Sequence, residues 1–441
     1  MKTKSKLLLI ITLIFINLFF CTYSYAQTNL NNFKQDLTIN SEVSGLNIYS
    51  ESAVLMDSRT GKVLYTKNAT QKMYPASTTK ILTAIIAIEK CQITDKITAS
   101  KNAVMSIPSG YSNAAIQVGE ALSVKDLLDV FLIHSANEAG FILAEHISGS
   151  IDNFANLMNE KALEIGCKNT HFTNPSGIQD ENHYSTAYDM ALIAQYCMKN
   201  ETFRQIVSKT SCKIAPTDKY EERYFVTTND LMRSSSKYYY EYAIGIKTGF
   251  TTQARNCLIA GSIKDGLELI TVTLGALTTE NGKSARYVDT INLFEYGFNN
   301  YKTQKIADKN TILKEVNIKN ATKDTENLSI LLKDDISALT DINLDLKSLQ
   351  PDIIINENLT APISEGSVVG KVIYNIDNIN YSCDLIAGNN VVKSNLIEVI
   401  CQIALAIVIL IILTKLLSSK KSTRKKSYSK KKVDYDSIYK F

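Results

Sequence analysis

The chain carries an apolar segment close to each end, and these two segments restrict what its 441 residues can fold into. Residues 7–20 are mostly apolar, follow three lysines and precede small residues that end at Ala26. A basic start, an apolar middle and a small-residue cleavage site are the parts of a secretory signal. We predict a signal peptide over residues 1–26, cleaved after Ala26. The alternative is an uncleaved N-terminal anchor, which would still place the following residues outside.

The second apolar segment predicts a membrane anchor. Residues 396–417 approach the ~20 residues that a helix needs to cross a bilayer. Residues 418–441 are rich in Lys and Arg, which stay in the cytoplasm when they flank a spanning helix. We predict a transmembrane helix over 396–417, a basic cytoplasmic tail over 418–441, and a body on the outer face of the membrane. A helix lying on the membrane surface is the alternative, although residues 403–413 are apolar all round.

The positive charge of the chain lies at its ends. The formal net charge is +4, but the N-terminal lysines and the tail carry more than this, so the exported body is mildly acidic. No basic surface remains for nucleic acid, and the tail suits anionic membrane lipid. The histidines lack metal-binding spacing and the cysteines form no tight framework. We predict no metal, no cofactor and buried free thiols at Cys91, Cys167, Cys197, Cys212, Cys257 and Cys383.

The body divides into two parts. Residues 45–301 contain two hairpin patterns, at 53–66 and 257–275, and the second turns at Asp265-Gly266. Helical patterns lie between the hairpins, including 77–89, 124–134 and 151–165. This arrangement predicts an α/β domain in which an antiparallel sheet packs with helices. Residues 305–392 are rich in Ile, Val, Asn, Thr and Asp and predict a small all-β domain.

A Ser-x-x-Lys sequence begins the predicted helix at 77–89. Ser77 and Lys80 are three residues apart, so they share one face of a helix. A buried lysine can lose its proton and activate a serine, and the amide at a helix start favours a developing oxyanion. The spacing alone is weak, because it recurs at Ser234 and Lys237 and again in the tail, for example at Ser418 and Lys421.

A Ser-x-Asn sequence has two candidates. Ser100 and Asn102 lie in a polar stretch typical of a turn. Ser135 and Asn137 end an apolar helical stretch, which would present their side chains from a buried support. We therefore select the second pair.

The third sequence, Lys247-Thr248-Gly249, is the only Lys-[Ser/Thr]-Gly in the chain. It follows an apolar run and precedes the second hairpin, so we predict that it lies on a strand. Glycine there lets a substrate backbone approach closely, and the lysine and threonine suit an anionic group. The three sequences occur in the order found in β-lactamases and penicillin-binding proteins.

The combination resembles the low-molecular-mass penicillin-binding proteins that act as D-alanyl-D-alanine carboxypeptidases. The resemblance runs from about Ser52 to Tyr301 and includes residues 74–80, 135–139, 169–177 and 184–190. Residues 361–370 resemble the β-rich second domain of that family. The fold implied is a serine β-lactamase/transpeptidase-like domain followed by the all-β domain. Peptidoglycan pentapeptide is the implied substrate, and β-lactams are the implied inhibitors.

The resemblance also implies roles in bond cleavage. Ser77 would attack the carbonyl between the last two D-alanines, with Lys80 as its general base. Ser135 would pass the proton to the departing D-alanine. Asn137 would hold both the peptide and Lys80, and water would then hydrolyse the acyl-enzyme.

Other residues would bind the substrate. The resemblance places its terminal carboxylate on Lys247 and Thr248, with Arg286 as a further candidate. The oxyanion hole would consist of the amides of Ser77 and Phe250.

Three alternatives remain open. A β-lactamase would need a glutamate for deacylation, and no Glu-x-x-Leu-Asn lies between Asn137 and Lys247. A non-catalytic penicillin-binding sensor is disfavoured because all three sequences are intact. An endopeptidase that cleaves cross-links is chemically adjacent to a carboxypeptidase and is not distinguished from it. The anchor departs from the surface-lying helix often found in the family.

Overall fold

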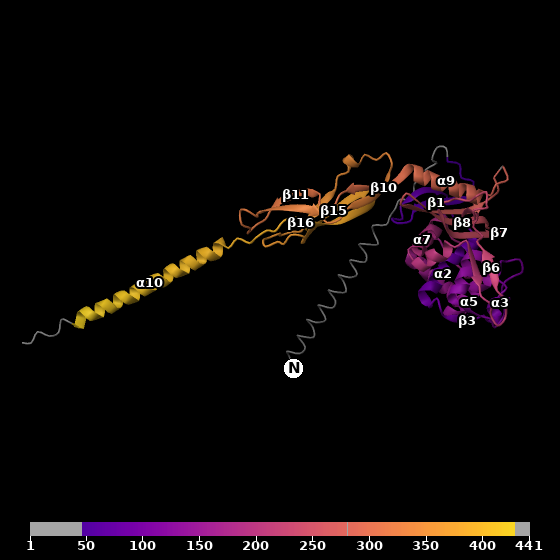
Figure 1. Cartoon of the computed structure of the whole chain (residues 1–441), viewed down its shortest axis with the longest axis horizontal. Helices are drawn as coiled ribbons and strands as arrows, with labels where there is room; N and C mark the ends of the chain where they lie inside the picture. The colour runs from indigo at the N-terminus through magenta and orange to yellow at the C-terminus, as the bar shows by residue number, and fades with distance from the viewer. Residues whose placement is uncertain (1–45, 280, 428–441) are drawn as a thin grey trace, which may run out of the picture. The chain divides into compact units, whose positions relative to one another are not determined.

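The computed structural model describes residues 46–279 and 281–427, and the chain within them forms two compact units (Figure 1). The first extends to Thr303 and includes Leu339–Leu344, and the second comprises Gln304–Ala338 and the chain from Asp345 onwards. The predicted signal peptide, with its cleavage point at Ala26, and residues 428–441 of the predicted tail lie outside the described residues.

The first unit is built on a five-stranded antiparallel sheet. Its strand order is β2-β1-β9-β8-β7, so β7 forms one edge. Both predicted hairpins are confirmed as β1–β2 and β8–β9, and the latter turns at Asp265-Gly266. The bounds are β1 (Ser52–Asp57), β2 (Val63–Lys67), β7 (Ala243–Thr251), β8 (Arg255–Lys264) and β9 (Leu267–Ala276).

The sheet has a core on each face because successive strand residues point to opposite sides. On β1, Val54 and Met56 belong to one buried cluster, whereas Ala53 and Leu55 belong to the other. Helices α2 (Lys80–Lys90), α5 (Asn137–Ser148) and α7 (Ala187–Met198) cover the first face, and α9 (Ala285–Asn300) covers the second (Figure 1). The α/β fold predicted from the sequence is therefore confirmed.

The remaining elements of this unit are short, apart from one long helix. Residues 151–165, predicted as a helix, form α6 (Ile151–Ile165). Two small antiparallel sheets of two strands each pair β3 with β4 and β5 with β6. The other bounds are η1 (Ala76–Thr79), β3 (Lys96–Thr98), α3 (Lys101–Met105), β4 (Ala121–Ser123), α4 (Val124–Asp129), η2 (Val130–His134), α8 (Glu201–Val207), β5 (Ser211–Ile214), β6 (Arg223–Val226) and η3 (Asp230–Met232).

The second unit is β-rich, as predicted. An antiparallel sheet has the strand order β11-β12-β16-β15-β14. The bounds are β11 (Ile312–Asn317), β12 (Asn327–Leu332), β14 (Asp352–Ile355), β15 (Val368–Ile376) and β16 (Ile379–Ala387), with a 3-10 turn η4 (Leu346–Ser348). Strands β10 (Tyr301–Ala307) and β13 (Ile336–Asp341) form a separate two-stranded sheet.

Helix α10 (Leu396–Ser427) follows the β-rich sheet. Within the described chain, it contains the one stretch long and apolar enough to cross a membrane, Val399–Leu417, with a mean hydropathy of 2.7. The helix continues beyond the predicted anchor of residues 396–417 as far as Ser427. The first part of the predicted basic tail is therefore helical.

Candidate active site

A cleft of about 440 Å³ opens between β7 and the helical side of the first unit. Six of the eight residues selected from the sequence line it: Ser77, Ser135, Asn137, Thr248, Gly249 and Phe250. The other two, Lys80 and Lys247, are 0% and 1% exposed. The fold thus gathers three segments that are more than 50 residues apart in sequence.

Ser77 lies in the 3-10 turn η1, and the α-helix that the sequence predicted to begin at residue 77 begins instead at Lys80. A 3-10 helix has three residues per turn, so side chains three apart lie directly above one another. Lys80 begins α2, and its Nζ donates to Ser77 Oγ over 2.9 Å. The local helix type therefore brings the amine to the hydroxyl.

The Lys80 amine is enclosed by polar acceptors. Besides Ser77, it donates to Asn137 Oδ1 and to the Ser176 carbonyl, each at 2.7 Å. Burial holds the pKa of Lys80 well below its usual value, the nearby Lys247 cation lowers this pKa further, and Glu138 opposes both. The side chain is thus oriented toward Ser77 in surroundings that favour loss of its proton.

Ser135 and Asn137 stand where one helix ends and the next begins. Ser135 terminates the π-helical turn η2 in a left-handed conformation, with φ of 68°. Asn137 begins α5, and its backbone amide and Nδ2 both donate to the Ser112 carbonyl, at 2.9 and 2.8 Å. These contacts fix the side-chain amide so that Oδ1 faces Lys80.

The rejected pair of the same pattern has a different environment. Ser100 caps α3, and its side chain and that of Asn102 both bind the carboxylate of Glu145, each at 2.5 Å. Neither residue lines the cleft. This pair therefore has a local structural role at the start of α3.

Edge strand β7 provides the opposite wall of the cleft. The Lys247 amine donates to the Thr248 carbonyl at 3.0 Å, and burial, followed by repulsion from Arg286, lowers the pKa of Lys247 to about 7. Thr248 Oγ1 lies 2.6 Å from Thr228 Oγ1. Arg286, from α9, donates to the Gly249 carbonyl at 3.3 Å and lines the cleft. This wall combines cations and hydroxyls, which suits a carboxylate.

Two glycines allow other segments to approach the Ser77 turn. A Cβ on Gly249 would lie 3.1 Å from both the Pro75 carbonyl oxygen and the Ser77 amide nitrogen. A Cβ on Gly177 would lie 1.9 Å from the Ala76 carbonyl oxygen, and Gly177 has φ of 75°. The main chain at Gly249 and at Gly177 therefore contacts the turn from two sides, at distances that a residue larger than glycine would prevent.

The segment around Gly177 also includes residues that the sequence did not select for the site. Ser176 provides the carbonyl that binds Lys80, and Asn174 Oδ1 accepts from the amides of residues 176, 177 and 178. This segment lay within the quoted family resemblance, but its role comes from main-chain atoms. No side-chain pattern could have identified the Ser176 carbonyl as a ligand of Lys80.

His183 supports the turn that carries Ser77 through a hydrogen bond to Thr79. Its Nδ1 accepts from the Thr173 amide at 3.1 Å, so Nε2 carries the proton and donates to Thr79 Oγ1 at 2.8 Å. Burial lowers the pKa of His183 to about 3, which keeps the ring neutral. The sequence did not select this histidine, because its partner is 104 residues away.

The described residues contain no group of three or more His, Cys, Asp or Glu side chains that could hold a metal ion. Of the six cysteines predicted as free thiols, all are free, four are buried, and Cys91 and Cys383 are half-buried.

The cleft holds a serine–lysine pair next to the edge strand of an antiparallel sheet, and the Ser-x-Asn and Lys-Thr-Gly sequences form its walls. This combination defines an acyl-transferring enzyme of the penicillin-recognising class. Residues 38–278 match the family described as D-alanyl-D-alanine carboxypeptidase, and residues 301–393 match the C-terminal domain of penicillin-binding protein 5. The chain belongs to this family of low-molecular-mass penicillin-binding proteins. It is a serine-type D-alanyl-D-alanine carboxypeptidase of cell-wall synthesis, as its motifs predicted.

Individual relatives agree with the family match. The D-alanyl-D-alanine carboxypeptidase DacF of Bacillus subtilis is 33% identical over 334 residues, which cover 74% of this chain and 82% of the relative. DacA of Haemophilus influenzae is 30% identical over an alignment that covers 75% of this chain and 82% of the relative. The crystal structure of penicillin binding protein 5 from Haemophilus influenzae aligns with a TM-score of 0.60 and 28% identity, over 79% of this chain and 98% of that structure.

We predict that Gly177→Ala slows labelling by a fluorescent penicillin about tenfold or more. Its Cβ would overlap the Ala76 carbonyl and displace the turn that carries Ser77. Gly149→Ala is the matched control, because Gly149 has nearly the same φ, 74°, but an added Cβ there would meet no atom of the described residues within 4 Å. Equal labelling rates in the two folded variants would contradict the proposed role of this contact.

Proposed function

We propose that Ser77 is the nucleophile that removes the terminal D-alanine of a peptidoglycan stem peptide. The hydrogen bond of 2.9 Å between the Lys80 amine and the Ser77 hydroxyl is the observation that carries this proposal. A neutral Lys80 accepts the Ser77 proton as Oγ attacks the carbonyl carbon of the penultimate D-alanine. The amides of Ser77 and Phe250 stabilise the oxyanion. Ser77 is then esterified to the peptide.

Departure of D-alanine and hydrolysis of the ester take place in the same cleft. Ser135 passes a proton to the departing D-alanine nitrogen, and Asn137 holds Lys80 and the substrate amide. Water then hydrolyses the ester and regenerates Ser77. Exposure of Phe250, at 62%, supports an accessible backbone on this edge strand.

In this proposal, residues of β7 and α9 bind the substrate carboxylate. Lys247 provides a buried cation, Thr248 provides a hydroxyl, and Gly249 lets the peptide lie close to the strand. Arg286 supplies a second cation from α9, and its hydrogen bond to the Gly249 carbonyl supports a place at the end of the carboxylate site.

The test of the nucleophile uses a pentapeptide that ends in D-Ala-D-Ala. Mass spectrometry should show loss of one alanine with the wild-type chain and none above background with Ser77→Ala. A fluorescent penicillin should label the wild type covalently and leave this variant unlabelled. Ser100→Ala is the control, because its hydroxyl lies outside the cleft. Equal release by wild type and Ser77→Ala would refute the assignment.

The pKa of Lys247 gives a second prediction. Without substrate this pKa is about 7, so the amine is a cation at lower pH and neutral at higher pH. A carboxylate binds the cation, so above about pH 7 binding also requires uptake of a proton. KM for the D-Ala-D-Ala peptide should therefore rise as pH increases, by up to about tenfold per unit.

The control for this prediction is the same peptide with a C-terminal amide. It lacks the carboxylate, so its KM should change little between pH 6 and pH 9. If both peptides gave the same pH profile, Lys247 would not be the group that binds the carboxylate.

Membrane attachment is proposed to use α10. Family membership and the apolar stretch Val399–Leu417 support an anchor, and the basic residues that follow support a cytoplasmic tail. In this proposal the signal peptide is cleaved after Ala26, both folded units lie outside, and the tail contacts anionic lipid.

Alkaline carbonate extraction should leave the full chain in the membrane pellet, because a spanning helix is not released by loss of surface charge interactions. A chain that ends at residue 393 should be soluble and still release D-alanine. Release of the full chain into the supernatant would favour the alternative of a helix lying on the membrane surface.

A further inference from the structure

A buried tyrosine hydroxyl lies beside the proposed carboxylate site but has no role in the mechanism above. Tyr287 follows Arg286 in the first turn of α9 and is 1% exposed. Its ring stacks on that of Tyr238, with 4.9 Å between the ring centroids. The packed ring therefore holds the hydroxyl in one place, next to a residue that lines the cleft.

The Tyr287 hydroxyl joins the start of α9 to the segment of residues 228–230. It accepts from Arg286 Nη2 at 3.1 Å and from the Asp230 amide at 3.3 Å, and it donates to the Thr228 carbonyl at 3.3 Å. A phenol hydroxyl has a single hydrogen to donate and two lone pairs to accept with, so these contacts use its full capacity. Burial raises the pKa of Tyr287, which keeps the donated hydrogen in place at neutral pH.

Arg286 and Thr228, which the Tyr287 hydroxyl contacts, both line the cleft. Arg286 Nη1 also donates to the Gly249 carbonyl at 3.3 Å, and the guanidinium carbon lies 4.7 Å from the centre of the Tyr287 ring. The guanidinium is thus fixed at two nitrogens and over one aromatic face. Thr228 Oγ1 lies 2.6 Å from Thr248 Oγ1, so it adjoins the hydroxyl already proposed to bind the carboxylate.

The contact between the two threonines leaves one hydrogen for a ligand. One hydroxyl must donate to the other, so the second hydroxyl hydrogen of the pair can be donated elsewhere. Thr228 is also held through its backbone, because its amide donates to the Ile133 carbonyl at 3.2 Å and its carbonyl accepts from Tyr287. Tyr287 therefore holds both Arg286 and the threonine pair where they line the cleft.

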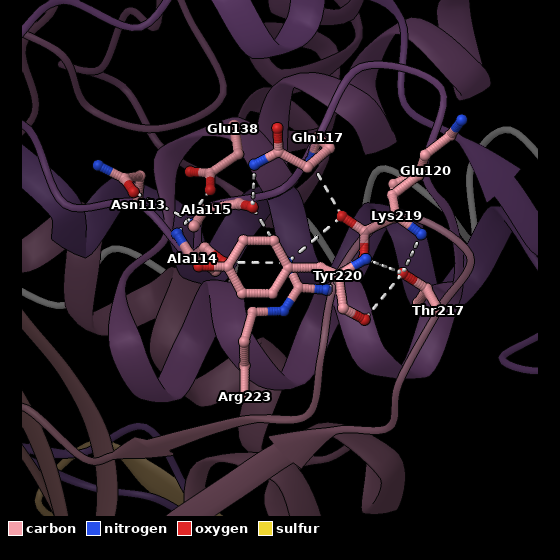
Figure 2. Close-up of polar contacts among 10 residues, drawn as sticks. All are labelled: Asn113, Ala114, Ala115, Gln117, Glu120, Glu138, Thr217, Lys219, Tyr220 and Arg223. Atoms are coloured by element: carbon pink, nitrogen blue, oxygen red, sulfur yellow. Dashed lines mark hydrogen bonds and ion pairs between the residues drawn. The ribbon is translucent and has the colours of Figure 1, made fainter.

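A second arginine of this unit shows the same surroundings with an acid added. Arg223 donates to the Ala114 and Ala115 carbonyls at 3.1 and 3.2 Å, and its guanidinium lies 4.7 Å from the centre of the Tyr220 ring (Figure 2). It also forms an ion pair with Glu120, which is 0% exposed (Figure 2). Main-chain carbonyls, an aromatic ring and a carboxylate thus surround this arginine.

Arg286 has the carbonyl and the ring but no acid. Its partners are the Gly249 carbonyl and the Tyr287 ring and hydroxyl, and within residues 46–279 and 281–427 it forms no ion pair. Its Nε is buried and has no hydrogen-bond partner there either. A half-buried guanidinium without an anion favours binding one, and Arg286 lines the cleft in which the substrate carboxylate is proposed to bind.

We propose that Tyr287 is a positioning residue for the substrate carboxylate: its hydroxyl fixes the Arg286 guanidinium and the Thr228 segment, so that both bind the carboxylate without rearranging. This inference rests on the proposed binding of the terminal carboxylate at this wall. Donors that are already in place lose little freedom when the ligand arrives, so they bind a carboxylate more tightly than mobile donors would. Tyr287 thereby increases the preference for a peptide with a free C-terminal carboxylate.

The experiment uses the full chain and two pentapeptides: the acid peptide, which ends in D-Ala-D-Ala, and the amide peptide, which has the same sequence and a C-terminal amide. Tyr287→Phe keeps the packed ring and removes only the hydroxyl. We expect KM for the acid peptide to rise about tenfold and kcat to change less than about threefold, because the carboxylate is bound in the ground state as well as in the transition state. KM for the amide peptide should stay within about twofold of the wild-type value.

Tyr240→Phe is the matched control. Tyr240 is also buried, and its hydroxyl donates to Glu295 of α9 at 2.8 Å, but it does not line the cleft. This variant loses a hydroxyl bond to the same helix, so it should leave both KM values unchanged even if it lowers the melting temperature. An equal loss of preference for the acid peptide in the two variants would show a general effect on α9 and would overturn the inference.

A double-mutant cycle decides whether Tyr287 acts through Arg286. Arg286→Gln should lose most of the preference for the acid peptide, and adding Tyr287→Phe should cause less than about a twofold further change. A further tenfold loss, of about the size expected for Tyr287→Phe alone, would mean that the hydroxyl acts independently of the guanidinium, against the inference.

Arg286→Lys tests the inference with Tyr287 intact, and it decides the matter if Tyr287→Phe does not fold. Lysine keeps the charge but lacks the planar group that binds Gly249, Tyr287 and a carboxylate at once. The preference for the acid peptide should therefore fall about tenfold, as in Tyr287→Phe. A wild-type preference in Arg286→Lys would show that charge alone is sufficient and that its orientation by Tyr287 has no role.

The outcomes separate this inference from the proposed function. An unchanged preference for the acid peptide in folded Tyr287→Phe would overturn the inference while the proposed role of Ser77 stands. D-Alanine release retained by Ser77→Ala would instead overturn the proposed function.

Discussion

The active site depends on the burial of one amine. Lys80 is inaccessible to water, yet it meets three polar acceptors from three separate segments: the Ser77 hydroxyl, the Asn137 side chain and the Ser176 carbonyl. Burial lowers the proton affinity of the amine, and the acceptors determine where it points. Neither effect would be sufficient alone, because an exposed lysine would stay charged and an unheld one would not face Ser77.

This arrangement requires main-chain atoms of other segments to contact the Ser77 turn on both sides. The absence of side chains at Gly249 and Gly177 lets β7 and the 174–178 segment approach it to van der Waals distance. Edge strand β7 can serve in this way because one of its sides has no partner strand within residues 46–279 and 281–427. The same exposed edge is available to an extended peptide, which links the support of the nucleophile to the binding of substrate.

The charges around the cleft form one system. Repulsion from Lys247 adds to burial in lowering the proton affinity of Lys80, and repulsion from Arg286 adds to burial in lowering that of Lys247. A substrate carboxylate would relieve this repulsion. Charge balance thus connects carboxylate binding with the protonation state of Lys80.

The sequence by itself determined the parts of the protein that depend on local pattern. The Asp265-Gly266 hairpin and the helix Ile151–Ile165 follow from turn chemistry and periodicity, and both occur where predicted. The apolar stretch within 396–417 likewise follows from composition. The order of the three motifs identified Ser77 among several similar serines, because spacing and sequence context are local properties.

Tertiary structure alone decided which groups surround those motifs. The Ser176 carbonyl and Lys80 are 96 residues apart, and Arg223 and Glu120 are 103 apart. Backbone carbonyls carry no sequence signature, and buried ion pairs use residue types that are common on any surface. The proton affinity of Lys80 was also beyond the sequence, since burial and neighbouring charge exist only once distant segments have packed together.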